Sequence, residues 1–215
     1  MKIDNSRVRA LGALKTRDKM DGSPISCSFL FFALFITSCA APDKQHQIVV
    51  STREQKLALL DRGNVLAIYP VSTSKFGLGD WRGSRFTPLG KLVVAQKIGD
   101  NAPSGAVFKD RRPTGEIVAP DSPGRDPIVT RILWLRGLEA QNANAFSRDI
   151  YIHGTPEERT IGTPASYGCI RMRSRDIINL YEIVGPGAEV AIVDARLAEV
   201  IPNFPATGRR SLAMH

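Results

Sequence analysis

The sequence predicts a mainly β domain, built as a sandwich or barrel of short strands with one principal helix. Three observations support this fold class. Short segments rich in Val, Ile, Leu and Tyr recur along residues 47–193, Gly and Pro separate them, and only one segment shows the apolar spacing typical of a helix. A fold of alternating βαβ units is therefore not expected.

Seven segments are predicted to be strands because aliphatic and β-branched residues dominate them. Turn-forming residues at 61–64 separate the second strand from the third, which predicts a hairpin near the start of the domain. The predicted strands are residues 47–51, 55–60, 64–71, 91–97, 130–136, 149–153 and 187–193.

One helix is predicted over residues 174–184. Ser174 is a candidate N-cap, Asp176 suits the positive end of a helix, and Pro186 with the following glycine cannot continue it. Apolar side chains recur at helical spacing from Ile177 to Val184, so we expect this face to pack on the sheet.

Two segments have no clear periodicity. Residues 99–127 form a long Gly- and Pro-rich connection, and loops of this length are lids, binding loops or disordered segments. Two interpretations of residues 99–127 are possible: a lid over Cys169, or a merely flexible insertion. Residues 194–215 are expected to form a C-terminal tail.

The N-terminal residues 1–39 have the features of an export signal. A short apolar run, from Ser28 to Ile36, follows a basic segment. The run ends in Phe-Ile-Thr-Ser-Cys, which resembles a bacterial lipobox, so Cys39 is the expected lipidation site and residues 40–46 the linker. A signal peptide cleaved near Ala40 and an uncleaved anchor remain alternatives, as does a start at Met20, which would leave no basic residue before the apolar run.

The charge distribution argues against nucleic-acid binding. The net charge of the chain is +8, and it falls to about +5 without residues 1–39. These charges do not form the clustered basic stripe with interleaved aromatic residues that a nucleic-acid surface requires.

Cys169 and His153 form a candidate catalytic pair. The chain has three cysteines; Cys27 lies in the signal segment and Cys39 at its end, which leaves Cys169 either inert or kept for its reactivity. His153, at the end of a predicted strand, could take the thiol proton. The amides of Gly168 and Cys169 could stabilise an oxyanion, and Arg171 could bind a carboxylate. A chance coincidence of Cys and His stays open on spacing alone.

The residues around this pair resemble a known signature. Ile-His-Gly-Thr at 152–155, followed by Ser-Tyr-Gly-Cys-Ile-Arg at 166–171, is similar to the motif of the L,D-transpeptidase catalytic domain, the YkuD-like family. Tyr-Pro-Val-Ser at 69–72 and Thr-Pro-Leu-Gly at 87–90 also resemble family segments. Tyr167 departs from the pattern, where a second histidine is usual.

The resemblance implies a β-sandwich or barrel of short mixed strands over residues 47–193, and cysteine-dependent acyl transfer. Cys169 would be the nucleophile and His153 the general base and acid, oriented by the Gly154 backbone, with Gly168 supplying an oxyanion amide. Arg171, Tyr167 and Ser166 would contact the substrate, although Ser166 could instead support the loop or face solvent.

The resemblance also implies the partners of the chain. Peptidoglycan stem peptides would be donor and acceptor, and the protein would face the cell wall or periplasm from a membrane anchor, with no cofactor and no metal. Three alternatives remain: a carboxypeptidase on the same scaffold, a wall-binding lipoprotein without catalysis, and a redox thiol protein. A redox role is disfavoured because no resolving cysteine lies near Cys169.

Overall fold

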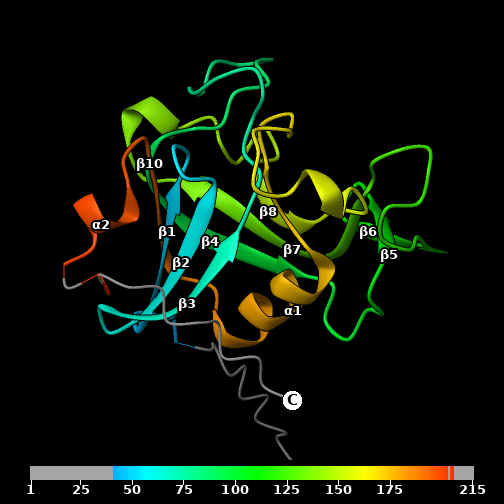
Figure 1. Cartoon of the computed structure of the whole chain (residues 1–215), viewed down its shortest axis with the longest axis horizontal. Helices are drawn as coiled ribbons and strands as arrows, with labels where there is room; N and C mark the ends of the chain where they lie inside the picture. The colour runs from blue at the N-terminus through cyan, green and yellow to red at the C-terminus, as the bar shows by residue number, and fades with distance from the viewer. Residues whose placement is uncertain (1–40, 203, 206–215) are drawn as a thin grey trace, which may run out of the picture. The chain divides into compact units, whose positions relative to one another are not determined.

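Ten strands join into one mixed sheet in the computed structural model, which describes residues 41–202, 204 and 205 (Figure 1). The prediction of a mainly β fold is confirmed. The strands are β1 (His46–Ser51), β2 (Lys56–Asp61), β3 (Asn64–Pro70), β4 (Gly90–Ile98), β5 (Ala106–Lys109), β6 (Arg112–Ile117), β7 (Ile128–Gly137), β8 (Tyr151–Gly154), β9 (Ile170–Met172) and β10 (Glu189–Val193).

The helices are few and short in this part of the chain. They are α1 (Ser174–Ile183), α2 (Leu197–Val200) and the 3-10 turns η1 (Ala140–Asn142) and η2 (Glu158–Thr160). None of the helices in residues 41–202 is long and apolar enough to cross a membrane. The expected signal segment and Cys39 lie outside the described residues.

The order of strands along the sheet is β3-β2-β1-β10-β4-β7-β5-β6, and β8 and β9 branch from β7. Most neighbours are antiparallel, but β1 pairs with β10 and β8 pairs with β9 in parallel. All seven predicted strands are present, with ends that differ by one or two residues. The parallel pair β8–β9 matters most here, because β8 carries His153 and Cys169 directly precedes β9.

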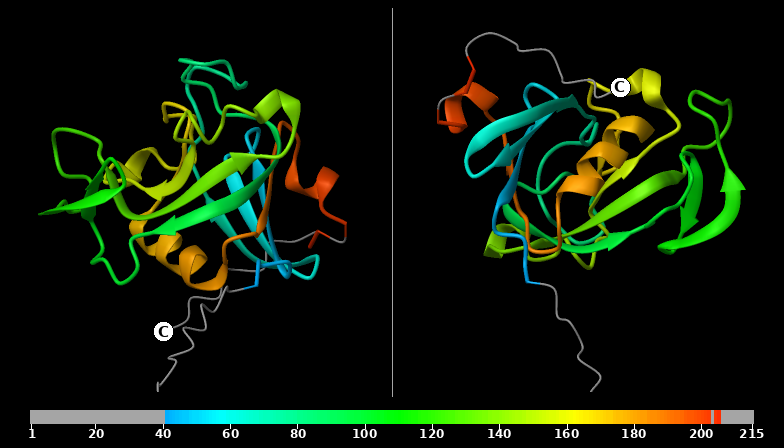
Figure 2. Two further views of the ribbon diagram at one scale, coloured as in Figure 1. Left: turned by 180° about the vertical axis from the view of Figure 1, so that it is seen from behind. Right: turned by 90° about the horizontal axis from the view of Figure 1, so that it is seen from below.

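Helix α1 lies against the sheet and packs on β7 and β8 (Figure 2). Its apolar stripe, with Ile177, Leu180 and Tyr181, is buried in the main core cluster. Lys97 on β4 donates from Nζ to the carbonyls of Tyr181 and Val184, at 2.6 and 2.8 Å, and so satisfies the last turn of the helix.

The predicted helix is confirmed, but its cap is different. Arg173 is the N-cap residue and Ser174 is the first residue inside the helix. The Ser174 hydroxyl lies 2.8 Å from Thr130 Oγ1, and its amide donates to Glu158 Oε1 at 2.8 Å. Ser174 is therefore used to fasten the helix to neighbouring elements.

Both ends of the domain extend beyond the predicted 47–193 body. In the expected linker 40–46, the Asp43 carboxylate accepts a hydrogen bond from the Gly185 amide at 2.8 Å. In the expected tail, Leu197 and Ile201 are buried in a second apolar cluster with Ala58 and Leu60 of β2. These flanking residues are packed parts of the domain.

The long connection 99–127 contains regular structure that the sequence did not reveal. Strands β5 and β6 form a hairpin, and β5 pairs with β7, so the hairpin extends one end of the sheet (Figure 1). The turn residues Asp110 and Arg111 have φ of 50° and 65°, the left-handed conformation of a tight hairpin turn.

Candidate active site

His153 lies on β8, and Cys169 directly precedes β9, the strand that pairs with β8 in parallel. Ile152 of β8 pairs with Ile170 of β9, and His153 pairs with Arg171. Because side chains alternate between the faces of a strand, His153, Cys169 and Arg171 share one face of this pair while the two isoleucines are buried in the core. The strand pair thus brings together residues that stand 16 positions apart in the sequence.

The His153 imidazole is held in one orientation by the backbone. Its Nδ1 lies 2.7 Å from the Gly154 carbonyl oxygen, so Nδ1–H donates there and Nε2 is left as the basic nitrogen. The ring is 5% exposed, and burial lowers the pKa of His153 from 6.5 to about 4, with the nearby Arg171 charge acting in the same direction. The imidazole is therefore neutral at physiological pH.

A bulge in β7 accompanies this arrangement. The pairing of β7 with β8 shifts register between Val129 and Ile132, next to His153. Thr130 in this bulge has a φ of 74°, which is rare for a β-branched residue. Its hydroxyl accepts from the Gly105 amide at 3.0 Å and lies 2.8 Å from Ser174 Oγ, so neighbouring elements hold the strained backbone in place.

Gly154 fits only as glycine at this point. A Cβ there would lie 2.6 Å from the Val129 carbonyl oxygen, inside van der Waals contact. The absence of a side chain lets β7 pass close to the residue whose carbonyl orients His153.

The Cys169 thiol is partly exposed and lies at the edge of a small apolar cluster that includes Phe108 and Tyr151. Its Sγ donates to the Asp149 carbonyl oxygen at 3.4 Å. Burial raises the pKa of Cys169 to about 11, although the Tyr151 amide and the Arg171 charge act against this shift. The resting cysteine is thus a protonated thiol.

Residues 165–169, which we call the nucleophile loop after the predicted role of Cys169, contain hydrogen bonds that bear on two of our expectations. Ser166 is fully buried; its hydroxyl donates to the Cys169 carbonyl at 2.6 Å and accepts from the Gly168 amide at 3.1 Å. Ser166 therefore supports the loop, as in the alternative given above, and the Gly168 amide is not free to bind an oxyanion in this conformation. Among the residues described, the Cys169 amide has no hydrogen-bond acceptor.

The nucleophile loop is also held from outside. Thr87 donates from Oγ1 to the Gly168 carbonyl at 2.9 Å and accepts from the Ser74 amide at 2.9 Å. Gly168 has a φ of 128°, a conformation that favours glycine. The Thr87 hydroxyl thus ties the loop before β4 to the turn that presents the thiol.

Arg171 is engaged within the protein, contrary to its expected contact with substrate. It is 7% exposed, forms an ion pair with Asp126 and donates from Nη1 to the Ala165 carbonyl at 3.3 Å. Asp126 also accepts from Thr155 Oγ1 at 2.6 Å. The guanidinium therefore joins the end of the long connection to β9.

Tyr167, the residue that departs from the family motif, faces solvent. It is 52% exposed, its ring centroid lies 5.6 Å from that of Phe76, and Lys75 donates from Nζ to its hydroxyl at 3.4 Å. A tyrosine in this position is open to contact with a ligand.

The β5–β6 hairpin turn reaches the surroundings of the thiol. Arg111 donates from Nη1 to Asp149 Oδ1 at 2.9 Å and to the Tyr151 hydroxyl at 3.0 Å, and its guanidinium lies 4.4 Å from the centroid of the Trp134 ring. Asp149 is the residue whose carbonyl accepts from Cys169. The hairpin is therefore attached beside the cysteine.

Several residues that shape this site were not predicted from the sequence. Asp126, Asp149 and Arg111 act through side-chain partners distant in sequence, and no local pattern marks them. Tyr151 was predicted only as part of a strand. It stands two positions before His153, and this spacing indicates that the two side chains lie on the same face of the strand. In residues 41–202, 204 and 205, no cluster of three or more His, Cys, Asp or Glu side chains could hold a metal ion.

Comparisons with known proteins agree on one family. Residues 45–192 match the model of the YkuD L,D-transpeptidase catalytic domain. The chain is 29% identical to the probable L,D-transpeptidase YbiS of Escherichia coli (strain K12) over 71% of this chain and 46% of that protein. It is 28% identical to the probable L,D-transpeptidase YcfS of the same strain, over 81% of this chain and 51% of YcfS. The chain thus spans about half the length of these two relatives.

Among solved structures, L,D-transpeptidase 3 from Mycobacterium tuberculosis in complex with a faropenem-derived adduct is similar to this chain. The sequence identity is 18%, the TM-score is 0.46, and the match covers 69% of this chain and 60% of that one.

Proposed function

Since this chain belongs to the L,D-transpeptidase catalytic domain family, we propose that it is a cysteine-dependent peptidoglycan L,D-transpeptidase. The observation that carries the proposal is the strand pair β8–β9, which presents a partly exposed thiol on the same face as a buried, neutral imidazole with a fixed tautomer. A base that is neutral at physiological pH and a nearby thiol are the two groups that thiol acyl transfer needs.

In the first half-reaction, Cys169 Sγ attacks the carbonyl carbon that follows the L-centre of the diamino acid in a tetrapeptide stem. His153 Nε2 takes the thiol proton as the S–C bond forms and gives it to the amine of the leaving D-alanine as the C–N bond breaks. The product is a thioacyl-enzyme, and the Cys169 amide is the donor best placed for the oxyanion.

In the second half-reaction, an amine of another stem or of a wall-linked protein attacks the thioester. His153 takes a proton from this amine and returns it to Sγ as the C–S bond breaks. The acyl group ends in a new amide bond, and the enzyme is regenerated.

The location of the protein is part of the same proposal. The signal-like segment 1–39 supports export, and lipidation of Cys39 would hold the domain at a membrane facing the cell wall, or periplasm. Intact mass of the membrane fraction tests this, and an unmodified Cys39 there would contradict it.

The test of activity is incubation of the protein with disaccharide-tetrapeptide, followed by mass spectrometry, beside Cys169→Ala and His153→Ala. A cross-linked dimer that both variants lose is expected. Tripeptide without dimer would indicate the alternative, an L,D-carboxypeptidase in which water takes the place of the acceptor. A chain that gives no product and no thioacyl adduct would fit the other alternative, a wall-binding lipoprotein without catalysis.

A further inference from the structure

Two cations and two aromatic rings form an exposed surface beside the nucleophile loop. This basic-aromatic platform consists of Lys75, Phe76, Arg85 and Tyr167. Lys75 Nζ lies 4.6 Å from the Tyr167 ring centroid and 5.3 Å from that of Phe76, and the Arg85 guanidinium lies 5.4 and 5.5 Å from the same rings. Phe76 is 44% exposed and Tyr167 52%.

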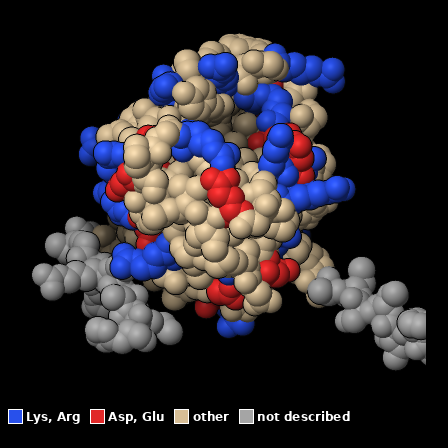
Figure 3. All heavy atoms as spheres, turned by 90° about the vertical axis from the view of Figure 1, so that its right-hand side faces the viewer, with Lys and Arg blue, Asp and Glu red and all other residues tan. Residues whose placement is uncertain are grey.

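The two cations of the platform have no acidic partner among the described residues. The other arginines near the site differ, because Arg171 pairs with Asp126 and Arg148 with Asp80. In Figure 3, Lys and Arg side chains gather over the upper part of the molecule, where Figure 1 places the loop between β3 and β4. Two neighbouring positive charges without a counter-charge favour the binding of an anion.

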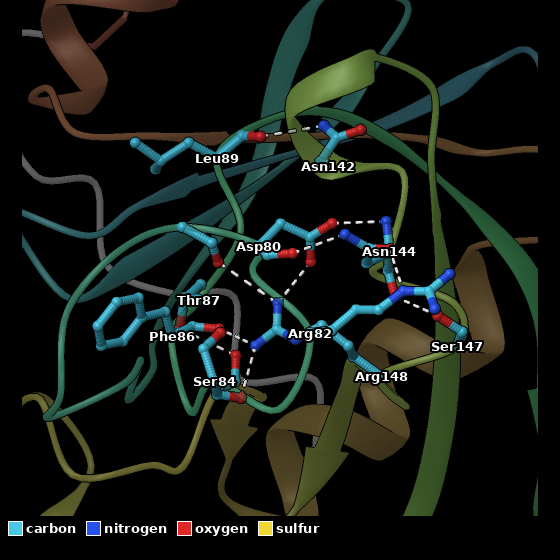
Figure 4. A network of polar contacts seen from close by, with 12 residues as sticks. Asp80, Arg82, Ser84, Phe86, Thr87, Leu89, Asn142, Asn144, Ser147 and Arg148 are labelled. Atoms are coloured by element: carbon cyan, nitrogen blue, oxygen red, sulfur yellow. Dashed lines mark hydrogen bonds and ion pairs between the residues drawn. The ribbon is translucent and has the colours of Figure 1, made fainter.

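The platform rests on a firmly held loop. Arg148 forms a buried ion pair with Asp80 and donates from Nη2 to the carbonyls of Ser84 and Phe86, at 3.0 and 2.7 Å (Figure 4). The Asn144 amide donates to Asp80 Oδ2 at 2.6 Å. These contacts fix the backbone on both sides of Arg85, so a ligand would not have to order the loop.

The platform is also fastened to the nucleophile loop. The Lys75 amide donates to the Ser166 carbonyl at 3.1 Å, and Ser74 Oγ donates to the Arg85 carbonyl. Tyr167 stands two residues before Cys169, a span of at most about 7 Å along the backbone. The platform therefore begins within two residues of the thiol, a span that about two residues of an extended peptide cover.

We propose that the basic-aromatic platform binds a free carboxylate of the peptide substrate, next to the bond that Cys169 attacks. The ammonium of Lys75 and the guanidinium of Arg85 would donate charge-assisted hydrogen bonds to the carboxylate, while Phe76 and Tyr167 would contact the adjoining apolar atoms. This inference deepens the proposed function and rests on it. The carboxylate has two possible sources, the C-terminus of the leaving residue and the side-chain carboxyl of the diamino acid.

Binding to the Cys169→Ala protein tests the platform separately from turnover. Three tetrapeptides are titrated and followed by nuclear magnetic resonance: the free acid, its C-terminal amide, and the form amidated at the diamino-acid carboxyl. We expect one amide to bind about five- to tenfold more weakly than the acid, as for a charged contact that stays partly exposed, and the amide that binds weakly identifies the source.

The assignment to Lys75 and Arg85 is tested by Lys75→Gln with Arg85→Gln in the same protein. This double variant should bind the acid and the amides equally, and raising the salt concentration should lower the preference of the parent protein. Arg82→Gln is the matched control, since Arg82 is an exposed cation of the same loop outside the platform, and it should keep the preference.

The proposal would be overturned if the Cys169→Ala protein bound all three peptides equally, or bound none of them. A preference that survives in the double variant would also overturn it. Failure of the proposed function would give a different result. The platform would still bind the peptide, but the protein with Cys169 intact would form no thioacyl adduct with it.

Discussion

His153 and Cys169 are both uncharged at neutral pH because burial opposes charge on each of them. The pKa of His153 is lowered to about 4 and that of Cys169 is raised to about 11. A stable thiolate beside an imidazolium is therefore not the resting state. In the reaction that we propose, the thiolate forms only as His153 takes the proton during attack, which couples proton transfer to formation of the S–C bond.

The pH dependence of alkylation follows from these two pKa values. The rate at which iodoacetamide modifies Cys169 should rise with pH from about 6 to about 10, because the thiolate fraction grows throughout this range. The measurement is site-resolved mass spectrometry of the Cys169 peptide in the absence of substrate. A rate that is already constant near neutral pH would indicate a preformed thiolate and contradict our interpretation.

The same imidazole makes folding stability depend on pH. The pKa of His153 is about 4 in the folded protein against 6.5 for an ordinary histidine, so the unfolded chain binds the additional proton between these values. The free energy of unfolding should therefore fall as pH drops from 6.5 to 4, by about 3 kcal/mol from this group.

Urea unfolding at several pH values measures this loss. His153→Gln is the control, since glutamine cannot titrate, and the difference in pH dependence between the two proteins isolates the histidine. Parallel curves for the two proteins would show that His153 does not titrate as we describe.

At the scale of elements, the β5–β6 hairpin is attached beside the thiol by one side chain of its turn. Arg111 connects the turn to Asp149 and Tyr151, while the outer strand β6 is exposed along its whole length. Arg111 and the pairing of β5 with β7 therefore both hold the hairpin in place.

Replacing Arg111 by alanine should loosen the hairpin. We expect the amides of residues 106–117 to exchange with deuterium several-fold faster. In the native protein, local opening of the hairpin must break the bonds to Asp149 and Tyr151, and these bonds are absent in the variant. Hydrogen-exchange mass spectrometry measures this change. The control is Arg112→Ala, an exposed neighbour in the same hairpin without an ion pair in the described part of the chain; equal effects of both variants would argue against a specific attachment.

The hairpin also shows where the sequence is an incomplete guide to this fold. The seven strands with long aliphatic runs were predictable, since local composition and burial coincide there. Strand β6 contains Pro113 and Gly115 and buries no side chain, and β9 is three residues long within the catalytic motif. Both exist because a neighbouring strand pairs with them, and this tertiary cause leaves no periodic pattern.

For the site, the proximity of Cys169 and His153 was predictable because a local motif contains both residues. The engagement of Arg171 was not, since its partner Asp126 lies 45 positions earlier in a segment without periodicity. The burial of Ser166 depends in the same way on packing between distant loops.

At the scale of the whole molecule, β10 joins the two parts of the sheet. It pairs with β1 on one side and β4 on the other. Ala191 lies in the middle of this strand, opposite Val49 and Lys91. A break in β10 should therefore affect the whole domain and not one edge.

Ala191→Pro should prevent stable folding, because proline removes a ladder hydrogen bond and its ring does not fit a central strand, at a cost of about 3 kcal/mol or more. Circular dichroism during thermal unfolding measures the loss. Ala191→Gly keeps the backbone donor and should cost only about 1 kcal/mol. A proline variant that melts like the glycine variant would mean that the two parts of the sheet hold together without β10.

The position of β10 also has a consequence for how the chain is made. Synthesis proceeds from the N-terminus, so β1 and β4 leave the ribosome long before the strand that joins them. Until residue 193 has been added, both strands present open edges, and the many contacts between distant parts of the chain make closure slow. The two parts of the sheet therefore stay separate until β10 has been synthesised, and a chain whose sheet has not yet closed suits the export that we propose.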